Sequence, residues 1–164
     1  MGRSKFFICG FAGAGKSHLL ATLELSGYQK VDLDQYLWKR HRESSEHNLA
    51  SVIERVGITE FRDYELRAIR ELTGPIILSL GAGTLRPETE QALSETGFCG
   101  MWLQTPFEIC CQRIQGDASR PVTYKMSERE LRELYRERME FYQRYQIVRN
   151  EREMIDFIEK SDNI

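Results

Sequence analysis

Short apolar segments alternate with longer amphipathic stretches along most of this chain. The apolar runs predict strands at 5–9, 28–31, 76–80, 98–103 and 145–149. The stretches between them repeat their apolar residues at helical spacing and predict helices at 16–26, 33–42, 47–56, 59–73, 87–95, 106–115, 127–142 and 152–160. Residues 116–126 are rich in turn residues and predict a loop. Strands that alternate with helices indicate an α/β fold, with helices on both faces of a parallel sheet.

The length and composition of the chain are those of one compact domain. It has 164 residues, of which 41% are apolar and 29% are charged, and it contains no repeat or linker-like tract. The formal net charge is −2, whereas nucleic-acid-binding domains usually carry a basic excess. We therefore expect a single domain spanning 1–164, a monomer that acts on a small molecule and has no nucleic-acid partner.

The cysteines and the apolar N-terminal run bear on the cellular location. Cys9, Cys99, Cys110 and Cys111 lack the spacing of metal ligands, and the adjacent pair cannot form an unstrained disulfide. All four lie in apolar runs, so we expect buried, reduced thiols and a cytoplasmic protein. The run 6–9 is too short for a signal peptide, and no stretch reaches about 18 apolar residues, so no membrane association is expected.

A glycine-rich loop, GFAGAGKS at 10–17, joins the first predicted strand to the first predicted helix. It fits the pattern G-x-x-x-x-G-K-[S/T] at every fixed position. Glycines let backbone N–H groups curve around phosphate oxygens, Lys16 can reach the β- and γ-phosphates, and the Ser17 hydroxyl can bind Mg²⁺. The loop alone does not distinguish a kinase from an ATPase or a GTPase. The residues expected at the triphosphate are Gly13, Ala14, Gly15, Lys16, Ser17 and His18.

Asp32 and Asp34 end the second predicted strand, at the sheet edge where ligands bind in parallel folds. Residues two apart share a strand face, so we expect both carboxylates to point the same way. One can hold Mg²⁺ through water, and the other can orient or deprotonate an attacking hydroxyl. A helix N-cap with a solvated aspartate is the alternative interpretation.

Arginines on two predicted helices are candidates for binding an anion. Arg62 lies three residues before Glu65, which falls in an apolar stripe and needs a partner. Arg138 lies in the middle of the apolar stripe of 127–142, where an unpaired charge is costly. A ligand carboxylate would satisfy these guanidinium groups through paired hydrogen bonds. Internal ion pairs, of Arg62 or of Arg138 with Glu65, are the alternatives.

Two further segments carry candidate residues. The small residues at 81–83 directly follow a strand, and they allow a backbone to approach a ligand closely. Arg120 lies in the predicted loop, from which it can neutralise charge on a phosphate in the transition state. Arg113 precedes it by seven residues and can stack on an adenine ring. A plain turn and a solvated charged loop are the alternative interpretations.

Taken together, these segments resemble the shikimate kinase family. In the order of the family they are GFAGAGKS (10–17), VDLD (31–34), FRDYE (61–65), GAGTLRPE (81–88), GDASRP (116–121) and ERMEFY (137–142). The phosphate loop is shared with many enzymes, whereas the combination with DLD, FR-x-x-E and an Arg-Pro lid is more specific. The resemblance implies a P-loop NTPase fold of the nucleoside-monophosphate-kinase type, with five parallel strands ordered 2-3-1-4-5. It also implies a substrate-binding region at about 35–65 and a lid at about 114–127.

The resemblance further implies the reaction, in which ATP with Mg²⁺ phosphorylates the 3-hydroxyl of shikimate, a step of aromatic amino-acid biosynthesis. The catalytic residues that it implies are Lys16, Asp34 and Arg120. It assigns Mg²⁺ to Ser17 and Asp32, and the nucleotide also to Arg113. The acceptor-binding residues that it implies are Asp34, Arg62, Gly81, Ala82, Gly83 and Arg138.

The chain departs from the family pattern in three places. Ala82 stands where the family has the second of three glycines, and Ile58 replaces an acid before FR-x-x-E. The family's adenine-capping Thr and Pro are missing after the last predicted strand, because 147–150 runs almost directly into a helix. We therefore expect adenine to be held loosely, chiefly by Arg113.

Two other functions stay open at this point. A kinase of another small polyol acid, such as gluconate, would use the same phosphate loop, and FR-x-x-E with the Arg-Pro lid is the feature that favours shikimate. A nucleotide-sensing module without catalysis would fit the altered glycine stretch and the shortened adenine loop. Such a module would bind ATP but release no ADP with any acceptor.

Overall fold

The protein is represented by a computed structural model, which describes residues 5–117 and 121–162. Its centre is a parallel sheet of five strands in the order β2-β3-β1-β4-β5, as the family resemblance implies. The register places Phe7 of β1 between Leu78 of β3 and Gly100 of β4. The strands are β1 (Lys5–Cys9), β2 (Gln29–Asp32), β3 (Ile76–Ser79), β4 (Phe98–Leu103) and β5 (Gln146–Val148).

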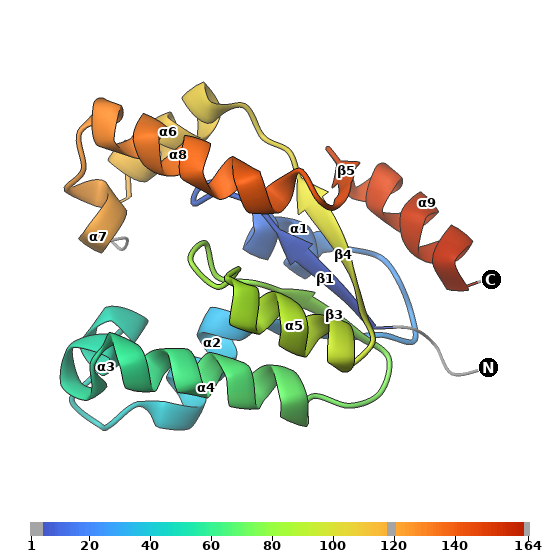
Figure 1. Cartoon of the computed structure of the whole chain (residues 1–164), viewed down its shortest axis with the longest axis horizontal. Helices are drawn as coiled ribbons and strands as arrows, with labels where there is room; N and C mark the ends of the chain where they lie inside the picture. Colours follow the sequence, from blue (N-terminus) through green and yellow to red (C-terminus); the bar gives the residue numbers. More distant parts are fainter. Residues whose placement is uncertain (1–4, 118–120, 163–164) are drawn as a thin grey trace.

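In the part of the chain that the structure describes, each strand is followed by one helix or by three, and the helices pack around the sheet. Figure 1 shows α2 to α5 gathered below the sheet in that view and α6 and α8 above it, with α7 at the end of α8 that is remote from β5. The helices of the described ranges are α1 (Lys16–Thr22), α2 (Leu33–His41), α3 (Leu49–Val56), α4 (Ile58–Glu71), α5 (Pro87–Glu95), α6 (Phe107–Gln115), α7 (Pro121–Tyr124), α8 (Glu128–Tyr142) and α9 (Glu151–Asp162).

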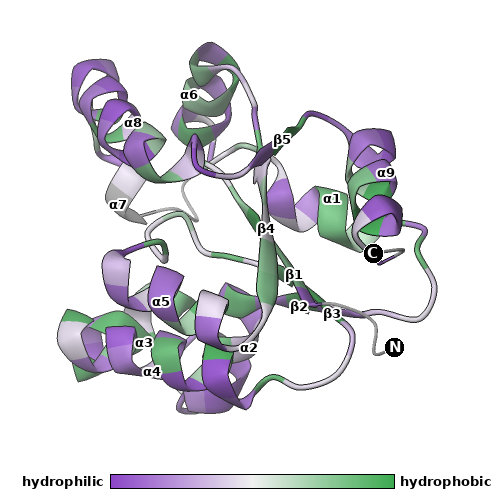
Figure 2. Ribbon diagram, turned by 45° about the vertical axis from the view of Figure 1, so that its right-hand side comes forward, coloured by the Kyte–Doolittle hydropathy of each residue, from purple (hydrophilic) through white to green (hydrophobic). Residues whose placement is uncertain are grey.

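Both faces of the central strand are covered, which explains why the strands read as continuous apolar runs. Phe6 contacts Phe157 of α9 edge to face, with 6.1 Å between ring centroids. Its neighbour Phe7 points to the opposite face and contacts Tyr145, with centroids 5.0 Å apart. Figure 2 shows the same arrangement as hydrophobic colour on the inner strands and hydrophilic colour on the outer faces of the helices. The core therefore fixes the loops at the carboxyl ends of the strands.

Two predicted elements differ from the structure. The helix expected at 16–26 ends at Thr22, because Leu23 leaves the helical conformation and packs in the core at 1% exposure. The Leu23 carbonyl then accepts a hydrogen bond from the ammonium of Lys30, which ties the turn to β2. The segment 116–126, expected to be a loop, contains the short helix α7.

The expectation for the cysteines holds at three of the four positions. All four are free thiols, and Cys9, Cys110 and Cys111 are buried. Burial raises the pKa of Cys9 to about 12. Cys99 is exposed, so the prediction of four buried thiols is wrong there. Successive side chains of a strand point to opposite faces, and Cys99 points away from the face on which its neighbour Phe98 is buried. Among the helices of residues 5–117 and 121–162, none has the length and apolar character that crossing a membrane requires.

Candidate active site

The glycine-rich loop turns tightly between β1 and α1. Gly13 and Gly15 have φ angles of 75° and 100°, in the left-handed region that favours glycine. A Cβ at Gly13 would also lie 2.8 Å from the carbonyl oxygen of Cys110 on α6. The conformation and the close approach of α6 both require glycine at position 13. The local sequence thus folds into the cradle that the motif predicts.

Lys16 begins α1 and is held against the loop. Its side chain is buried, and its ammonium donates hydrogen bonds to the carbonyl oxygens of Gly10, at 2.6 Å, and Phe11, at 3.0 Å. Arg113 of α6 reaches the same loop, where its Nη1 donates to the Gly13 carbonyl at 3.0 Å. Two cations from different elements therefore border the loop, an arrangement suited to a polyphosphate.

The residues expected to serve Mg²⁺ lie next to each other. The Ser17 hydroxyl donates to Asp32 Oδ2 at 2.5 Å, while Asp32 Oδ1 accepts from the backbone N–H of Gln35 and caps α2. Asp32 is therefore both the N-cap of α2 and a neighbour of the phosphate loop. Mg²⁺ prefers oxygen ligands and usually takes only one or two from a protein beside substrate phosphates. The pair fits that requirement, and the described residues contain no larger cluster of His, Cys, Asp and Glu that would hold a metal by itself.

A cavity of about 340 Å³ lies beside the phosphate loop and collects the acceptor residues that the sequence predicts. Five separate segments contribute to it: the loop after β1, α2, α3 with α4, the loop after β3, and α7 with α8. Its wall combines charged groups with apolar side chains such as Ile53, Ile58 and Phe61. The predicted residues that line it are Asp34, Arg62, Gly81, Ala82, Gly83 and Arg138.

Asp34 lies between the phosphate loop with Ser17 and Asp32, on one side, and the acceptor cavity, on the other. It lies in the first turn of α2, because β2 already ends at Asp32, so the expectation that both aspartates share a strand face is wrong. Asp34 borders the acceptor cavity and also a second cavity, of about 450 Å³, which Ser17 and Asp32 line. Within the described ranges it forms no hydrogen bond or ion pair. A Cβ at Gly81 would lie 2.6 Å from Asp34 Oδ1, so a larger residue at position 81 would displace the Asp34 carboxylate.

The environment of Asp34 prepares it to exchange a proton. Burial, the strongest influence, raises the pKa of Asp34 to about 6, and the charges of Asp32 and Glu65 act in the same direction. Lys16 and Arg62 oppose this rise. A carboxylate with a pKa near neutrality, facing a cavity, is suited to act as a general base.

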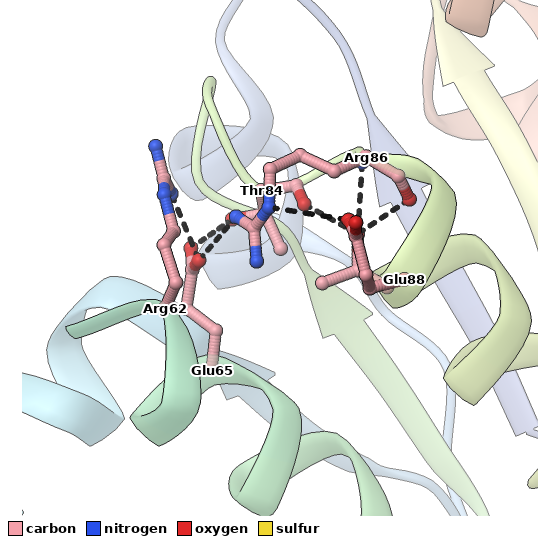
Figure 3. Close-up of polar contacts among 6 residues, drawn as sticks. Arg62, Glu65, Thr84, Arg86 and Glu88 are labelled. Atoms are coloured by element: carbon pink, nitrogen blue, oxygen red, sulfur yellow. Dashed lines mark hydrogen bonds and ion pairs between the residues drawn. The ribbon is translucent and has the colours of Figure 1, made fainter. Parts of the chain in front are cut away.

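Arg62 and Glu65 form the internal ion pair that was the alternative interpretation of Arg62, and they are part of a larger network (Figure 3). Glu65 Oε2 accepts from Arg62 Nη1 and from Arg86 Nη1, both at 2.8 Å, and Oε1 accepts from the Thr84 hydroxyl at 2.7 Å. Arg86 and Thr84 were not predicted to be parts of the site. The spacing of three residues indicated the Arg62–Glu65 pair, whereas Arg86 lies 21 residues from Glu65 and only the fold brings them together.

Arg138 differs from Arg62 in that it forms no ion pair among the described residues. It lines the cavity from α8, and within the described residues it has no hydrogen bond or ion pair. The internal partner considered for it, Glu65, is occupied by Arg62 and Arg86. Gly83 lies against both guanidinium groups, since a Cβ there would be 3.1 Å from Arg62 Nη2 and 3.6 Å from Arg138 Nη2. Two cationic groups therefore converge on one wall of the cavity.

The other predicted residues lie in different parts of the chain. Ala82 lines the cavity, and its carbonyl accepts a hydrogen bond from Tyr142 at 3.3 Å. His18 is exposed on α1, next to Ser17. Arg120 lies outside the described residues, so its predicted catalytic role stays a prediction. The loop after β5 is as short as expected: Asn150 caps α9 by accepting from the N–H of Glu153 at 3.0 Å.

The fold and the phosphate loop define the class of this protein, a P-loop NTPase of the nucleoside-monophosphate-kinase type. Comparison with known proteins then identifies the family. The family model described as shikimate kinase matches residues 12–157. A shikimate kinase of Persephonella marina is 31% identical over 140 residues, which cover 83% of this chain and 82% of the relative. The chain therefore belongs to the shikimate kinase family.

Other relatives and solved structures agree with this membership. A shikimate kinase of Geobacter sulfurreducens is 31% identical over 119 residues, but the match covers 70% of this chain and only 63% of that relative. The structure of Acinetobacter baumannii shikimate kinase in complex with shikimate has a TM-score of 0.72 at 24% identity, covering 96% and 89% of the two chains. A gluconokinase of Sinorhizobium meliloti has a TM-score of 0.64 at 16% identity, covering 98% and 94%. At these sequence identities, the two structures support the assignment of the fold only.

Proposed function

We propose that the protein transfers the γ-phosphoryl group of ATP to the 3-hydroxyl of shikimate, giving shikimate 3-phosphate and ADP. One observation carries the proposal beyond family membership. Among the residues that the structure describes, the Asp34 carboxylate and the Arg138 guanidinium have no hydrogen-bond or ion-pair partner, and both line one cavity beside the phosphate loop. A molecule with a hydroxyl at one end and a carboxylate at the other satisfies both groups.

The phosphate loop supplies the nucleotide side of the reaction. Lys16 exchanges its hydrogen bonds to the loop carbonyls for bonds to the β- and γ-phosphates, and Arg113 stays beside the loop near the nucleotide. Ser17 and Asp32 would hold Mg²⁺. The metal neutralises charge on the phosphates when it is bound. Arg120 adds a further positive charge from the lid.

The cavity supplies the acceptor side. Asp34 orients the attacking hydroxyl and accepts its proton, while Arg62 and Arg138 hold the carboxylate. Phosphoryl transfer needs the attacking oxygen, the phosphorus and the leaving oxygen roughly in line, so most of the catalytic effect comes from positioning and charge neutralisation. We further propose that the enzyme works in the cytoplasm as a monomer.

The test is release of ADP by the purified protein with Mg²⁺ and ATP, measured with and without shikimate. We expect rapid release only with shikimate, together with formation of a shikimate monophosphate detected by mass spectrometry. Failure of shikimate to stimulate ADP release would refute the proposal.

A parallel assay with gluconate tests the second candidate. The fold of a gluconokinase is related, but the apolar side chains of Ile53, Ile58 and Phe61 in the cavity wall favour a ring with an apolar face over an open-chain polyol. We expect ADP release with gluconate at less than about 1% of the shikimate rate, since polyol hydroxyls left unpaired against an apolar wall weaken binding strongly. Binding of ATP without release of ADP for any acceptor would instead indicate a nucleotide-sensing module.

A further inference from the structure

Glu65 is almost fully enclosed, at 1% exposure, and it contacts two arginines at once (Figure 3). Arg62 approaches its Oε2 from the same helix, and Arg86 approaches the same oxygen from the loop before α5, each at 2.8 Å. The other carboxylate oxygen is satisfied by Thr84. One negative charge is therefore shared between two positive charges.

This sharing changes what Arg62 offers to a ligand. A simple Arg62–Glu65 pair would be neutral, and a neutral pair attracts a carboxylate weakly. With Arg86 present, the side chains of Arg62, Glu65 and Arg86 together carry a net charge of +1. The exposed Glu88 carboxylate lies 3.9 Å from Arg86 Nε and offsets this charge only weakly, because solvent screens it. Nη1 of Arg62 makes the hydrogen bond to Glu65. Its Nη2 lies toward Gly83, on the wall where Arg138 also points its Nη2. The surplus charge thus faces the acceptor cavity.

Arg86 is held firmly in the position that this role requires. It is the N-cap residue of α5, with Pro87 as the first residue of the helix. Its backbone N–H donates to the Thr89 hydroxyl at 2.9 Å, and that hydroxyl in turn donates to the Thr84 carbonyl at 2.5 Å. Its side chain is mostly covered, at 22% exposure, so the contact with Glu65 is shielded from solvent. Arg86 does not line the cavity, and it therefore acts only through Glu65.

We propose that Arg86 is a positioning residue for the acceptor, which offsets the charge of Glu65 and so keeps Arg62 electropositive toward the substrate carboxylate. This inference rests on the proposed function, because it assumes an acceptor that carries a carboxylate. A unit charge at about 8 Å, at an effective dielectric constant of about 20, corresponds to an effect on anion binding of roughly ten- to thirtyfold.

The experiment compares shikimate with its uncharged methyl ester as acceptors for the wild type and for Arg86→Gln and Arg86→Lys. Glutamine still offers Glu65 a hydrogen bond but carries no charge, whereas lysine keeps the charge. For Arg86→Gln we expect the KM for shikimate to rise at least about tenfold and the KM for ATP to stay within about twofold. The preference for acid over ester, measured as the ratio of kcat/KM values, should fall by a similar factor. Arg86→Lys should retain most of that preference.

The matched control is Arg144→Gln, because Arg144 also pairs with a glutamate, Glu90 at 2.8 Å, but at an exposed site outside the cavity. We expect wild-type kinetics from it. If Arg86→Gln fails to fold, Arg86→Met replaces it, and thermal unfolding of each variant verifies the fold. An equal loss with acid and ester would mean a structural role and overturn the inference, as would an unchanged KM for shikimate. If the wild type itself releases no ADP with shikimate, the proposed function fails and this inference fails with it.

Discussion

The two halves of the site are built in different ways. The phosphate loop comes from eight consecutive residues, and its charged group, Lys16, is already bonded to carbonyls of the same loop. The acceptor cavity is assembled from five distant segments, and two of its charged groups, Asp34 and Arg138, have no protein partner within the described ranges. A local motif can satisfy its own polar groups, whereas a cavity keeps unpaired groups only where a ligand satisfies them.

The two parts of the site also correspond to two substrates in the proposed reaction: the phosphate loop to ATP, and the acceptor cavity to shikimate. ATP is used by many enzymes, and a contiguous loop suits a function that recurs on one scaffold. In the function that we propose, specificity for the acceptor depends on the spacing of Asp34 from Arg62 and Arg138, which the whole fold sets. Mutations in the two halves should therefore have distinct kinetic signatures.

Loss of Lys16 should have the largest effect. Lys16→Met removes the cation that we propose for contact with the transferred phosphate, and we expect kcat to fall roughly 10³-fold, with a smaller change in the KM for shikimate. The coupled assay for ADP release measures both constants. Lys39→Met, at an exposed position on α2, is the control and should leave both unchanged. Near-normal turnover by Lys16→Met would mean that the loop does not carry the reaction.

Loss of the Asp34 carboxylate should have the next largest effect. Asp34→Asn keeps the shape of the side chain but cannot accept a proton, and we expect kcat to fall by about 10²-fold. This lies at the lower end of the range for general bases, because a loose transition state demands little proton transfer. The exposed Asp63→Asn on the neighbouring helix α4 is the control. Full activity of Asp34→Asn would contradict the proposed role.

The pH dependence sharpens the same prediction. The pKa of Asp34 is raised to about 6, and only its deprotonated form can accept the hydroxyl proton. Activity should therefore be lost as the pH falls through about 6 and should be constant above about 7, and Asp34→Asn should lack this step. Measurement of kcat/KM for shikimate between pH 5 and 8 at saturating ATP checks the expectation. A wild-type profile that is flat across this range would count against Asp34 as the base.

Loss of Arg138 should affect the binding of shikimate more than the binding of ATP. Arg138→Met removes a charge that faces the cavity, and we expect the KM for shikimate to rise about 20-fold while the KM for ATP changes less than about threefold. Arg136→Met, on the exposed face of the same helix, is the control. Equal losses for both substrates would remove the distinction between the two halves of the site.

Ala82→Gly should have the smallest effect. The Ala82 methyl lies in the cavity lining, but the residue has an ordinary backbone conformation, and its carbonyl bond to Tyr142 does not depend on the side chain. We expect the KM for shikimate to change by less than about threefold, since one methyl in a pocket alters binding modestly. A change above about tenfold would show that this methyl controls acceptor fit.

The amino-acid sequence determined the local features by itself. The alternation of apolar and amphipathic segments was sufficient to predict the five strands and most helices. The phosphate loop at 10–17 was predictable because consecutive residues form it. The pair Arg62–Glu65 was also predictable, because a helix brings residues three apart together. The early end of α1 and the exposed side chain of Cys99 were not, because packing decides them.

Only the tertiary structure decided how the distant charges are paired. The sequence allowed Glu65 to neutralise Arg138, but the fold instead places Arg86 against Glu65 and leaves Arg138 facing the cavity. The reason is physical. A buried carboxylate takes the cations that the backbone brings within hydrogen-bonding distance, and the loop that carries Arg86 is positioned by β3 and α5, not by the residues around Glu65.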